Sequence, residues 1–188
     1  MEKTFEAVLV EQCAPTLAGV KPASLFRYQG ADGQLVLTSA AYWARELAPF
    51  GIAVRVLKRC SKTGACLIYL YRAGWLRQIL AEPSNRTFLE QMGYRMGHGC
   101  GGLLEQLRGR LCLERGFPHE IGVFLGYPLE DVVGFIEHQG RDYTCCGYWK
   151  AYGDPETARR VFEVYRRCTE RCKERFRQGA QITQLVAA

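Results

Sequence analysis

The amino-acid sequence predicts an α+β fold: a small, largely antiparallel sheet packed by helices, with a long helix closing the chain. The first observation is a β-hairpin pattern over about residues 52–72, where two segments rich in Val, Ile, Leu and Tyr flank the loop 60–64. The second is a set of segments in which apolar residues recur every three or four positions, the longest over residues 155–178. One or two further short strands complete the predicted sheet.

Length and composition bound the organisation of the chain. With 188 residues, 48% of them hydrophobic and 23% charged, the chain can bury one good core and is short for two. We therefore expect a single domain over residues 1–188. No run approaches the roughly 18 apolar residues of a membrane span, and Glu2 and Glu6 interrupt any apolar leader. These observations predict a cytoplasmic protein with no membrane contact.

The first half of the chain alternates helical and strand patterns. We expect a helix over residues 4–17, a strand over 23–28, a helix over 38–50, and hairpin strands over 52–59 and 65–72. Gly19 ends the first helix, and the segment 30–33 forms a turn. Thr38 or Ser39 caps the second helix, and Gly51 ends it.

The second half is mostly helical. We expect helices over residues 73–81, 85–92 and 103–113, two short helices that begin at Pro118 and Pro128, a strand around 143–149, and a helix over 155–178. Ser84 and Asp154 are the predicted N-caps of two of these helices. Cys168 and Cys172 share the apolar face of the last helix, because they lie four positions apart.

Nine cysteines in a chain without an export signal are typical of free thiols, metal ligands or redox groups rather than of a disulfide framework. Cys60 and Cys66 flank the hairpin loop and are interpreted as plain strand-end thiols, with a redox or ligand pair as the alternative. Cys168 and Cys172 are interpreted as small core residues, with a pair of metal ligands as the alternative.

The distribution of charge argues against sequence-specific DNA binding more clearly than it supports any particular partner. There are 25 Lys and Arg against 19 Asp and Glu, a net charge of +6, which favours acidic partners of many kinds. The two short helices resemble a helix-turn-helix, but the second one carries Glu130, Asp131, Glu137 and His138. The three acidic side chains would repel phosphate, and residues 128–138 lack the Arg, Lys, Asn or Gln that read base edges, so we do not expect sequence-specific DNA binding.

His119 and Glu120 are the first pair of candidate functional residues. In the first turn of the helix expected from Pro118, unsatisfied backbone amides favour a carboxylate and disfavour an imidazolium. A neutral imidazole at His119 could bind a metal or act as a base near neutral pH. In the structural alternative, His119 caps the helix or forms a local hydrogen bond, and Glu120 complements the helix dipole.

Cys145 and Cys146 are the second candidate pair. In an extended segment the two thiols face opposite sides, so that one is presented beside Tyr148 and Lys150. Lys150 could lower the pKa of that thiol and produce a nucleophile or a soft-metal ligand. The surrounding aromatic residues could form a stacking platform for a flat ligand, or they could simply belong to the core. They are Tyr143, Tyr148, Trp149 and Tyr152.

Several segments together resemble one protein family. The segments KPASLF, FPHEIGVFLGYPLEDVVGFIEHQG and YTCCGYWKAYGD, with the hairpin and the Arg-rich last helix, are similar to the DUF3793 family, small uncharacterised proteins of anaerobic Firmicutes. Its most specific segments are HEIGVFLGYP and CCGYWK. The resemblance implies an association with flavodoxin and ferrous-iron transport. The loop with His98 and Cys100 is particular to this chain, so neither is a predicted site residue.

These observations support three hypotheses. The first is a thiol-bearing protein of iron or redox metabolism, with Cys145 or Cys146 as redox thiol or metal ligand, and His119 and Glu120 as supporting groups. The bound metal would be iron or another soft or borderline metal, and the cofactor-binding residues would be Tyr148, Trp149 and Lys150. The second is an adaptor whose basic face docks an acidic redox protein such as flavodoxin. The third is an enzyme with Cys146 as nucleophile and His119 as base, which requires the two to meet in space.

Overall fold

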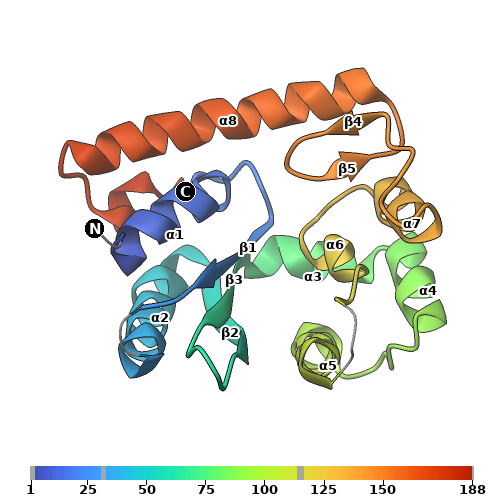
Figure 1. Ribbon diagram of the computed structural model, residues 1–188, viewed down its shortest axis with the longest axis horizontal. Helices are drawn as coiled ribbons and strands as arrows, with labels where there is room; N and C mark the ends of the chain where they lie inside the picture. Colours follow the sequence, from blue (N-terminus) through green and yellow to red (C-terminus); the bar gives the residue numbers. More distant parts are fainter. Residues whose placement is uncertain (1–2, 31–32, 114–116, 188) are drawn as a thin grey trace. The chain divides into compact units, whose positions relative to one another are not determined.

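The structure is a computed structural model that describes residues 3–30, 33–113 and 117–187. Its contacts divide the chain into two compact units. Unit 1 comprises Met1–Gly74 and Tyr165–Ala188, and unit 2 comprises Trp75–Val164. The helices, the small antiparallel sheets and the long last helix confirm the predicted α+β class (Figure 1).

Unit 1 is built on a three-stranded antiparallel sheet. In chain order it contains α1 (Phe5–Leu17), β1 (Ala23–Tyr28), α2 (Gly33–Leu47), β2 (Ile52–Arg59) and β3 (Cys66–Arg72). The strand order is β1-β3-β2, so the second strand of the predicted hairpin lies in the centre of the sheet. The bounds of β1 and β2 agree with the prediction, because their β-branched and aromatic residues lie between clear turn signals.

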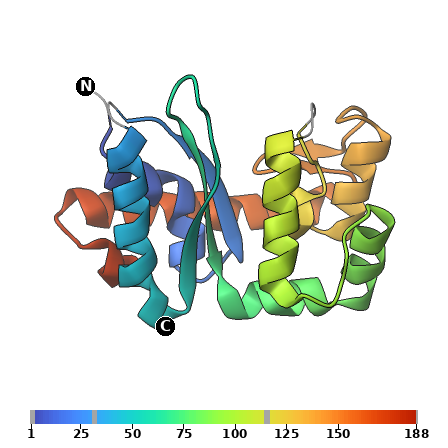
Figure 2. The same ribbon diagram turned by 90° about the horizontal axis from the view of Figure 1, so that it is seen from below.

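One face of this sheet is covered by α1 and α2, which lie on the same side of it (Figure 2). The strand register places Phe26 opposite Ile68, and both are buried in the core with Leu9 of α1. The indole Nε1 of Trp43 in α2 donates to Oε1 of Glu6 in α1 at 3.1 Å. The two helices therefore share both the apolar core and a polar contact above it.

Some helix ends lie where the local sequence predicted them, and others do not. Thr4 is the N-cap of α1, and its side chain accepts a hydrogen bond from the amide of Ala7. The predicted start of α2 at Thr38 was wrong, because the helix begins five residues earlier, at Gly33. Thr38 instead donates its hydroxyl back to the carbonyl of Gln34, inside the helix. Gly51 ends the following 3-10 turn, η1 (Ala48–Phe50), with a φ of 70°. The turn predicted over 30–33 includes residues 31 and 32, which lie outside the described ranges.

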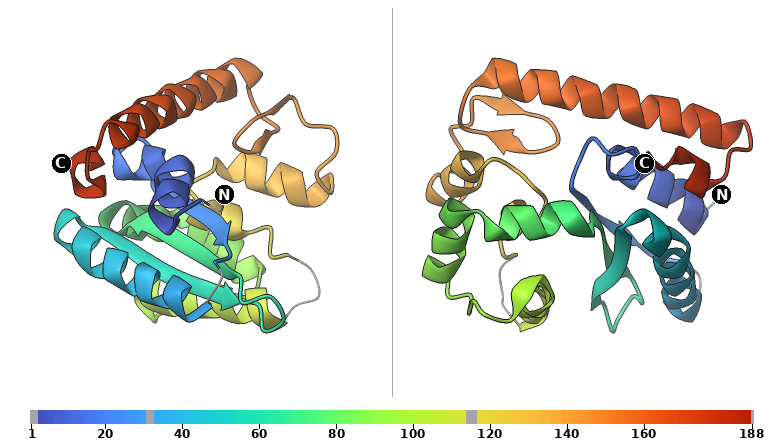
Figure 3. Two further views of the ribbon diagram at one scale, coloured as in Figure 1. Left: turned by 60° about the vertical axis from the view of Figure 1, so that its left-hand side comes forward. Right: turned by 180° about the vertical axis from the view of Figure 1, so that it is seen from behind.

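The last helix, α8 (Pro155–Arg177), belongs to both units, with the boundary at Tyr165. Asp154 caps it as predicted, accepting from the amides of Glu156 and Thr157. In unit 1 it runs alongside α1, and the short η2 (Ile182–Leu185) follows it (Figure 3). Cys168 and Cys172 face the core, as their spacing predicted. Among the described helices, none combines the length and apolar character needed to cross a membrane.

Unit 2 is helical apart from one small hairpin. Its elements are most of α3 (Ala73–Ala81), α4 (Pro83–Gln91), α5 (Gly99–Leu113), α6 (Ile121–Phe124), α7 (Leu129–Glu137), β4 (Cys145–Cys146), β5 (Lys150–Ala151) and the start of α8. The predicted N-cap Ser84 was wrong, since α4 begins at Pro83 with Glu82 as N-cap. The helix expected from residue 103 begins four residues earlier, at Gly99.

The two segments that carry the predicted chemistry also differ from expectation. Pro118 does not start a helix: the carbonyls of Pro118 and His119 accept from residues three positions on, and α6 begins only at Ile121. His119 and Glu120 therefore precede the helix rather than occupy its first turn. The strand expected around 143–149 is instead a hairpin of two-residue strands, because the chain turns back where Gly147 donates to the carbonyl of Trp149.

Candidate functional site

A cavity of about 200 Å³ lies within unit 2, between α7 and the segments on either side of it. We call it the aromatic pocket. Its walls are mainly apolar and come from Phe117, Ile121, Leu125, Val132 and Phe135. Tyr127 and Trp149 add two more rings, and the polar lining groups come from His119, Asp131 and Lys150. The pocket thus joins the HEIG segment to the YWK segment.

Trp149 reaches the pocket because Asp131 holds its loop against α7. The carboxylate of Asp131 is 4% exposed and lies in the first turn of α7. Its Oδ2 accepts from the indole Nε1 of Trp149 at 2.7 Å, and its Oδ1 accepts from the amides of Tyr152 and Gly153 at 2.6 and 3.1 Å. One buried carboxylate therefore joins the hairpin to the helix with three hydrogen bonds.

Aromatic contacts fix the plane of the Trp149 ring. It stacks on Tyr127 with ring centroids 4.9 Å apart and an interplanar angle of 25°. The ring of Phe162, from α8, meets it edge-on at 4.5 Å. The Tyr127 hydroxyl donates to the carbonyl of Tyr148 at 3.2 Å, which links the stack to the hairpin turn. Stacked and edge-on pairs of this kind are favourable arrangements, so the wall is preformed.

Two glycines allow the hairpin to approach the helices. A Cβ atom at Gly147 would lie 2.3 Å from the ring of Phe162. A Cβ atom at Gly134, inside α7, would lie 2.5 Å from the ring of Tyr152. Since real Cβ atoms do not approach other atoms this closely, both positions require glycine for packing rather than for backbone freedom.

His119 and Lys150 provide the basic groups of the pocket. The exposed imidazole of His119 lies 4.8 Å from the ring of Phe135, centroid to centroid. The ammonium of Lys150 donates to the carbonyl of Gly140 at 2.6 Å and lies 4.8 Å from the ring centre of Tyr143. That hydrogen bond uses one of three ammonium donors. Lys150 is therefore oriented by the protein and retains donors for another acceptor.

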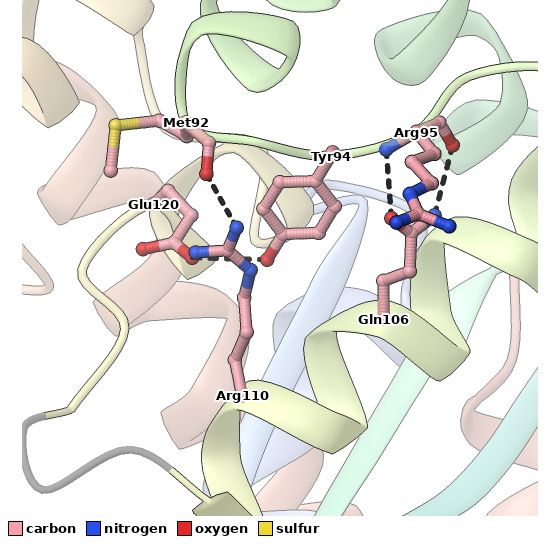
Figure 4. A network of polar contacts seen from close by, with 6 residues as sticks. All are labelled: Met92, Tyr94, Arg95, Gln106, Arg110 and Glu120. Atoms are coloured by element: carbon pink, nitrogen blue, oxygen red, sulfur yellow. Dashed lines mark hydrogen bonds and ion pairs between the residues drawn. The ribbon is translucent and has the colours of Figure 1, made fainter.

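Glu120 is not among the described residues that line the pocket, and its side chain belongs to a separate polar network (Figure 4). Its side chain is 3% exposed, and its Oε1 accepts from the Tyr94 hydroxyl at 3.1 Å and from Arg110 Nη1 at 3.3 Å. The Arg110 guanidinium also donates to the Met92 carbonyl and lies 4.4 Å from the ring centre of Tyr94. The network ties α5 to the chain on both sides of it, which is a structural role.

Neither cysteine of the Cys145-Cys146 pair is among the described residues that line the aromatic pocket. Cys145 is half-buried and pairs with Ala151, whereas Cys146 is exposed and pairs with Lys150 across the hairpin. Directly paired side chains leave the same face of an antiparallel hairpin, but the Lys150 ammonium is directed to the Gly140 carbonyl. Tyr148 is exposed and does not line the pocket either.

The described residues contain no group of three or more His, Cys, Asp or Glu side chains that could hold a metal ion. Cys145, Cys146 and His119, the predicted metal ligands, are therefore not assembled into such a group. Cys168 and Cys172, suggested as an alternative pair of ligands, belong to unit 1, whereas the other predicted site residues belong to unit 2.

Sequence reasoning missed the residues that shape the pocket. Asp131 was considered only as a charge that repels DNA, yet it anchors Trp149. A signal was available, since an acidic residue in a first helical turn beside apolar residues is a frequent acceptor of backbone amides. Phe117 and Phe135 carry no local signal that separates a pocket wall from ordinary core.

Comparisons with known proteins gave one result. The sequence model of one family, described as "Protein of unknown function (DUF3793)", matches residues 9–186, which is nearly the whole chain. The comparison with curated proteins and the comparison with solved structures gave no match.

Proposed function

Because the chain belongs to the DUF3793 family, whose description names no activity, we propose a function from the geometry of the aromatic pocket. The protein binds a flat, ring-bearing small molecule that carries an acidic group, in the cytoplasm. The observation that supports this proposal is the meeting of His119, Trp149 and Lys150 at one cavity of about 200 Å³.

The shape of the cavity favours a flat ligand. The cavity opens to solvent and its walls are mainly apolar and aromatic, which is typical of small-molecule sites. Phe117 lines the space and is 49% exposed, which places an apolar side chain at an open edge of the pocket. A planar ring would stack against Trp149 and cover the apolar walls, and the burial of apolar surface would supply most of the binding free energy.

The charges favour an acidic group on that ligand. Lys150 and His119 both line the pocket, and the Lys150 ammonium keeps donors beyond the one that Gly140 accepts. Asp131 also lines the pocket, but both of its oxygens already accept hydrogen bonds from the hairpin. A carboxylate or phosphate on the ligand would therefore meet a cation and an imidazole rather than an unpaired carboxylate.

Calorimetric titration with three small probes tests the proposal. Benzoate is flat and anionic, benzyl alcohol is flat and neutral, and cyclohexanecarboxylate is anionic but not flat. We expect benzoate to bind most tightly. Lys150→Met should weaken benzoate binding by about tenfold or more, the worth of one charge-assisted hydrogen bond, and should leave benzyl alcohol unchanged. Trp149→Leu should weaken the binding of both flat probes.

Two neighbouring residues provide matched controls for these variants. Tyr148→Leu removes an exposed aromatic side chain next to Trp149 in sequence, and Arg141→Met removes an exposed cation in the turn after α7. Neither residue lines the pocket, so neither change should alter benzoate affinity. The proposal fails if benzoate gives no saturable heat, or if the control variants lose as much affinity as the pocket variants.

The redox and iron hypothesis for the same segments stays a prediction. Its support is an exposed thiol, Cys146, at a position paired with Lys150 across the hairpin. Metal analysis and thiol titration of protein purified without oxygen would test it, and ordinary thiol reactivity with substoichiometric metal would count against it. Docking of an acidic redox protein such as flavodoxin also stays a prediction, for which salt-sensitive association is the measurement.

A further inference from the structure

A second cavity, of about 410 Å³, lies within unit 1 between α8, the C-terminal segment and the turn after α1. One wall is a row of three α8 arginines, Arg167, Arg171 and Arg175, with Cys168 and Cys172 beside them. The opposite wall is apolar and includes Val20 and Leu185. We call this cavity the arginine groove. It shares no residue with the aromatic pocket, so an activity there goes beyond the function proposed above.

Among the described residues that line the groove, the charged side chains come from arginines. None of the described residues that line it is an Asp or Glu. Elsewhere on α8, Glu170 forms an ion pair with Arg166 at 2.6 Å and Glu174 forms one with Arg177 at 3.3 Å. Arg175 is held in place by a hydrogen bond from Nη2 to the carbonyl of Gln184 at 3.1 Å. Three guanidinium groups spaced one helical turn apart suit a ligand with more than one carboxylate or phosphate.

The two thiols of the groove have unequal roles. The Cys168 thiol donates to the carbonyl of Ala14 at 3.7 Å, and it also lies within hydrogen-bond reach of the Cys172 sulfur. The hydrogen bond from Cys168, with the charges of Arg175 and Arg171, lowers the pKa of Cys172 to about 7 despite its burial. Its hydrogen bond to Cys172, and then burial, raise the pKa of Cys168. The environment therefore favours the thiolate form at Cys172 and the protonated form at Cys168.

Cys172 is only 5% exposed, but it lines the groove, so a reactant must enter the groove to meet its sulfur. Reagents are therefore selected by the arginines before they reach the thiolate. We propose that the arginine groove binds small disulfides that carry carboxylate groups and that Cys172 forms a mixed disulfide with them.

The reaction is a thiol–disulfide exchange with the bound disulfide as the oxidant. The Cys172 thiolate attacks one sulfur of the ligand, the new sulfur–sulfur bond forms as the ligand's own bond breaks, and the second half of the ligand leaves as a thiolate that takes a proton from water. A neighbouring cation and a hydrogen-bond donor both stabilise the attacking thiolate, which raises its concentration at neutral pH.

The mixed disulfide should persist, because Cys168 is poorly placed to displace the ligand. Residues four apart on a helix have Cβ atoms about 5–6 Å apart, whereas a disulfide requires roughly 3.5–4.5 Å. A bond between Cys168 and Cys172 would therefore distort α8. Release should need an external thiol, so the site would report the balance of small thiols and disulfides around the protein.

The test compares two disulfides of opposite charge on the full-length protein. Glutathione disulfide carries carboxylates, whereas cystamine carries only amines. Peptide mapping by mass spectrometry measures the initial rate of adduct formation at Cys172 and, in the same sample, at the exposed Cys146. We expect the ratio of the rate with glutathione disulfide to the rate with cystamine to be about tenfold higher at Cys172 than at Cys146. The preference should shrink as ionic strength rises.

Variants of two arginines on α8 distinguish the effect of a positive charge inside the groove from the effect of a positive charge elsewhere on the helix. Arg171→Gln should lower the rate ratio at Cys172 several-fold, and Arg171→Lys, which keeps a cation, should restore part of it. Arg166→Gln is the matched control, because Arg166 pairs with Glu170 and does not line the groove. Circular dichroism checks that each variant is folded.

A variant of the second thiol tests the role of its proton. Cys168→Ala removes the hydrogen bond to Cys172 and should slow adduct formation there, whereas Cys168→Ser keeps a donor and should slow it less. The proposal is overturned if Cys172 shows no adduct while Cys146 reacts, or if both cysteines show the same rate ratio. Benzoate binding to the aromatic pocket should be unchanged in these variants, so the two proposals fail independently.

Discussion

Asp131 accepts three hydrogen bonds from Trp149, Tyr152 and Gly153, and all three donors belong to the hairpin segment. An ionised carboxylate suits this position because it offers acceptors only. At the scale of single residues, the aromatic pocket therefore depends on a side chain that supports its wall more than on the groups that would touch a ligand.

Asp131→Asn should destabilise the protein by roughly 2–4 kcal/mol, because the amide would turn an N–H toward a donor inside a buried site. Urea unfolding followed by circular dichroism measures the change. Glu137→Gln is the matched control, since Glu137 lies at the exposed end of the same helix. Equal effects in the two variants would show that Asp131 does not anchor the hairpin.

Lys21 is a second residue whose environment has a measurable consequence. It is buried, and its ammonium lies 5.9 Å from the ring centre of Tyr165. Burial lowers its pKa from 10.5 to about 8. Since the unfolded chain then binds more protons between those two values, this group costs stability below about pH 8, and the cost disappears as pH rises toward 10.5.

Lys21→Met should therefore stabilise the protein, by up to about 3 kcal/mol at pH 7 and about 1 kcal/mol less at pH 9. Urea unfolding at pH 6, 7, 8 and 9 measures the gap between variant and wild type. This range avoids most of the window in which Cys13 titrates, because burial raises the pKa of that thiol from 9.0 to about 12. A gap that stays constant over this range would contradict the assignment of the cost to the charge of Lys21.

At the scale of elements, glycines decide how the β4–β5 hairpin packs on its neighbours. Tyr152, which follows β5, occupies the space where Gly134 of α7 has no side chain. An alanine there would be the better helix former, but its Cβ has no room. Local helix propensity and packing thus oppose each other at Gly134, and packing decides.

Gly134→Ala should destabilise the protein by about 1–3 kcal/mol through overpacking against Tyr152. Gly109→Ala is the matched control inside another helix, α5, where a Cβ would meet nothing within 4 Å. It should stabilise the protein by roughly 0.5–1 kcal/mol. Thermal unfolding of both variants measures the two signs, and stabilisation by both substitutions would refute the packing argument.

Element prediction succeeded where the signal was local. The spacing of apolar residues, the cap at Asp154 and the turn residues around the hairpin located α1, β1, β2 and α8 to within a residue or two. The prediction of helix starts failed at Thr38, a plausible cap residue that lies inside α2. It also failed at Pro118, because the helix expected to begin there starts three residues later. A cap residue is informative only if the preceding residues are not helical, and that depends on what they pack against.

At the scale of the whole molecule, the chain forms two compact units, and unit 1 combines the N-terminal and C-terminal parts of the sequence. The prediction of one domain over residues 1–188 concerns whether the units fold together, and it stays a prediction. Each proposed site lies within one unit: the aromatic pocket in unit 2 and the arginine groove in unit 1.

By itself, the sequence determined the fold class, most helices and strands of unit 1, the family, and the stretch around His119, Trp149 and Lys150 as the place to look for a site. Tertiary structure alone decided that Glu120 joins Tyr94 and Arg110, that Asp131 anchors Trp149, and that the Cys172 thiol opens to a groove. The physical reason is range. Periodicity and caps act within a few residues, whereas these contacts join distant segments that only the packed core brings together.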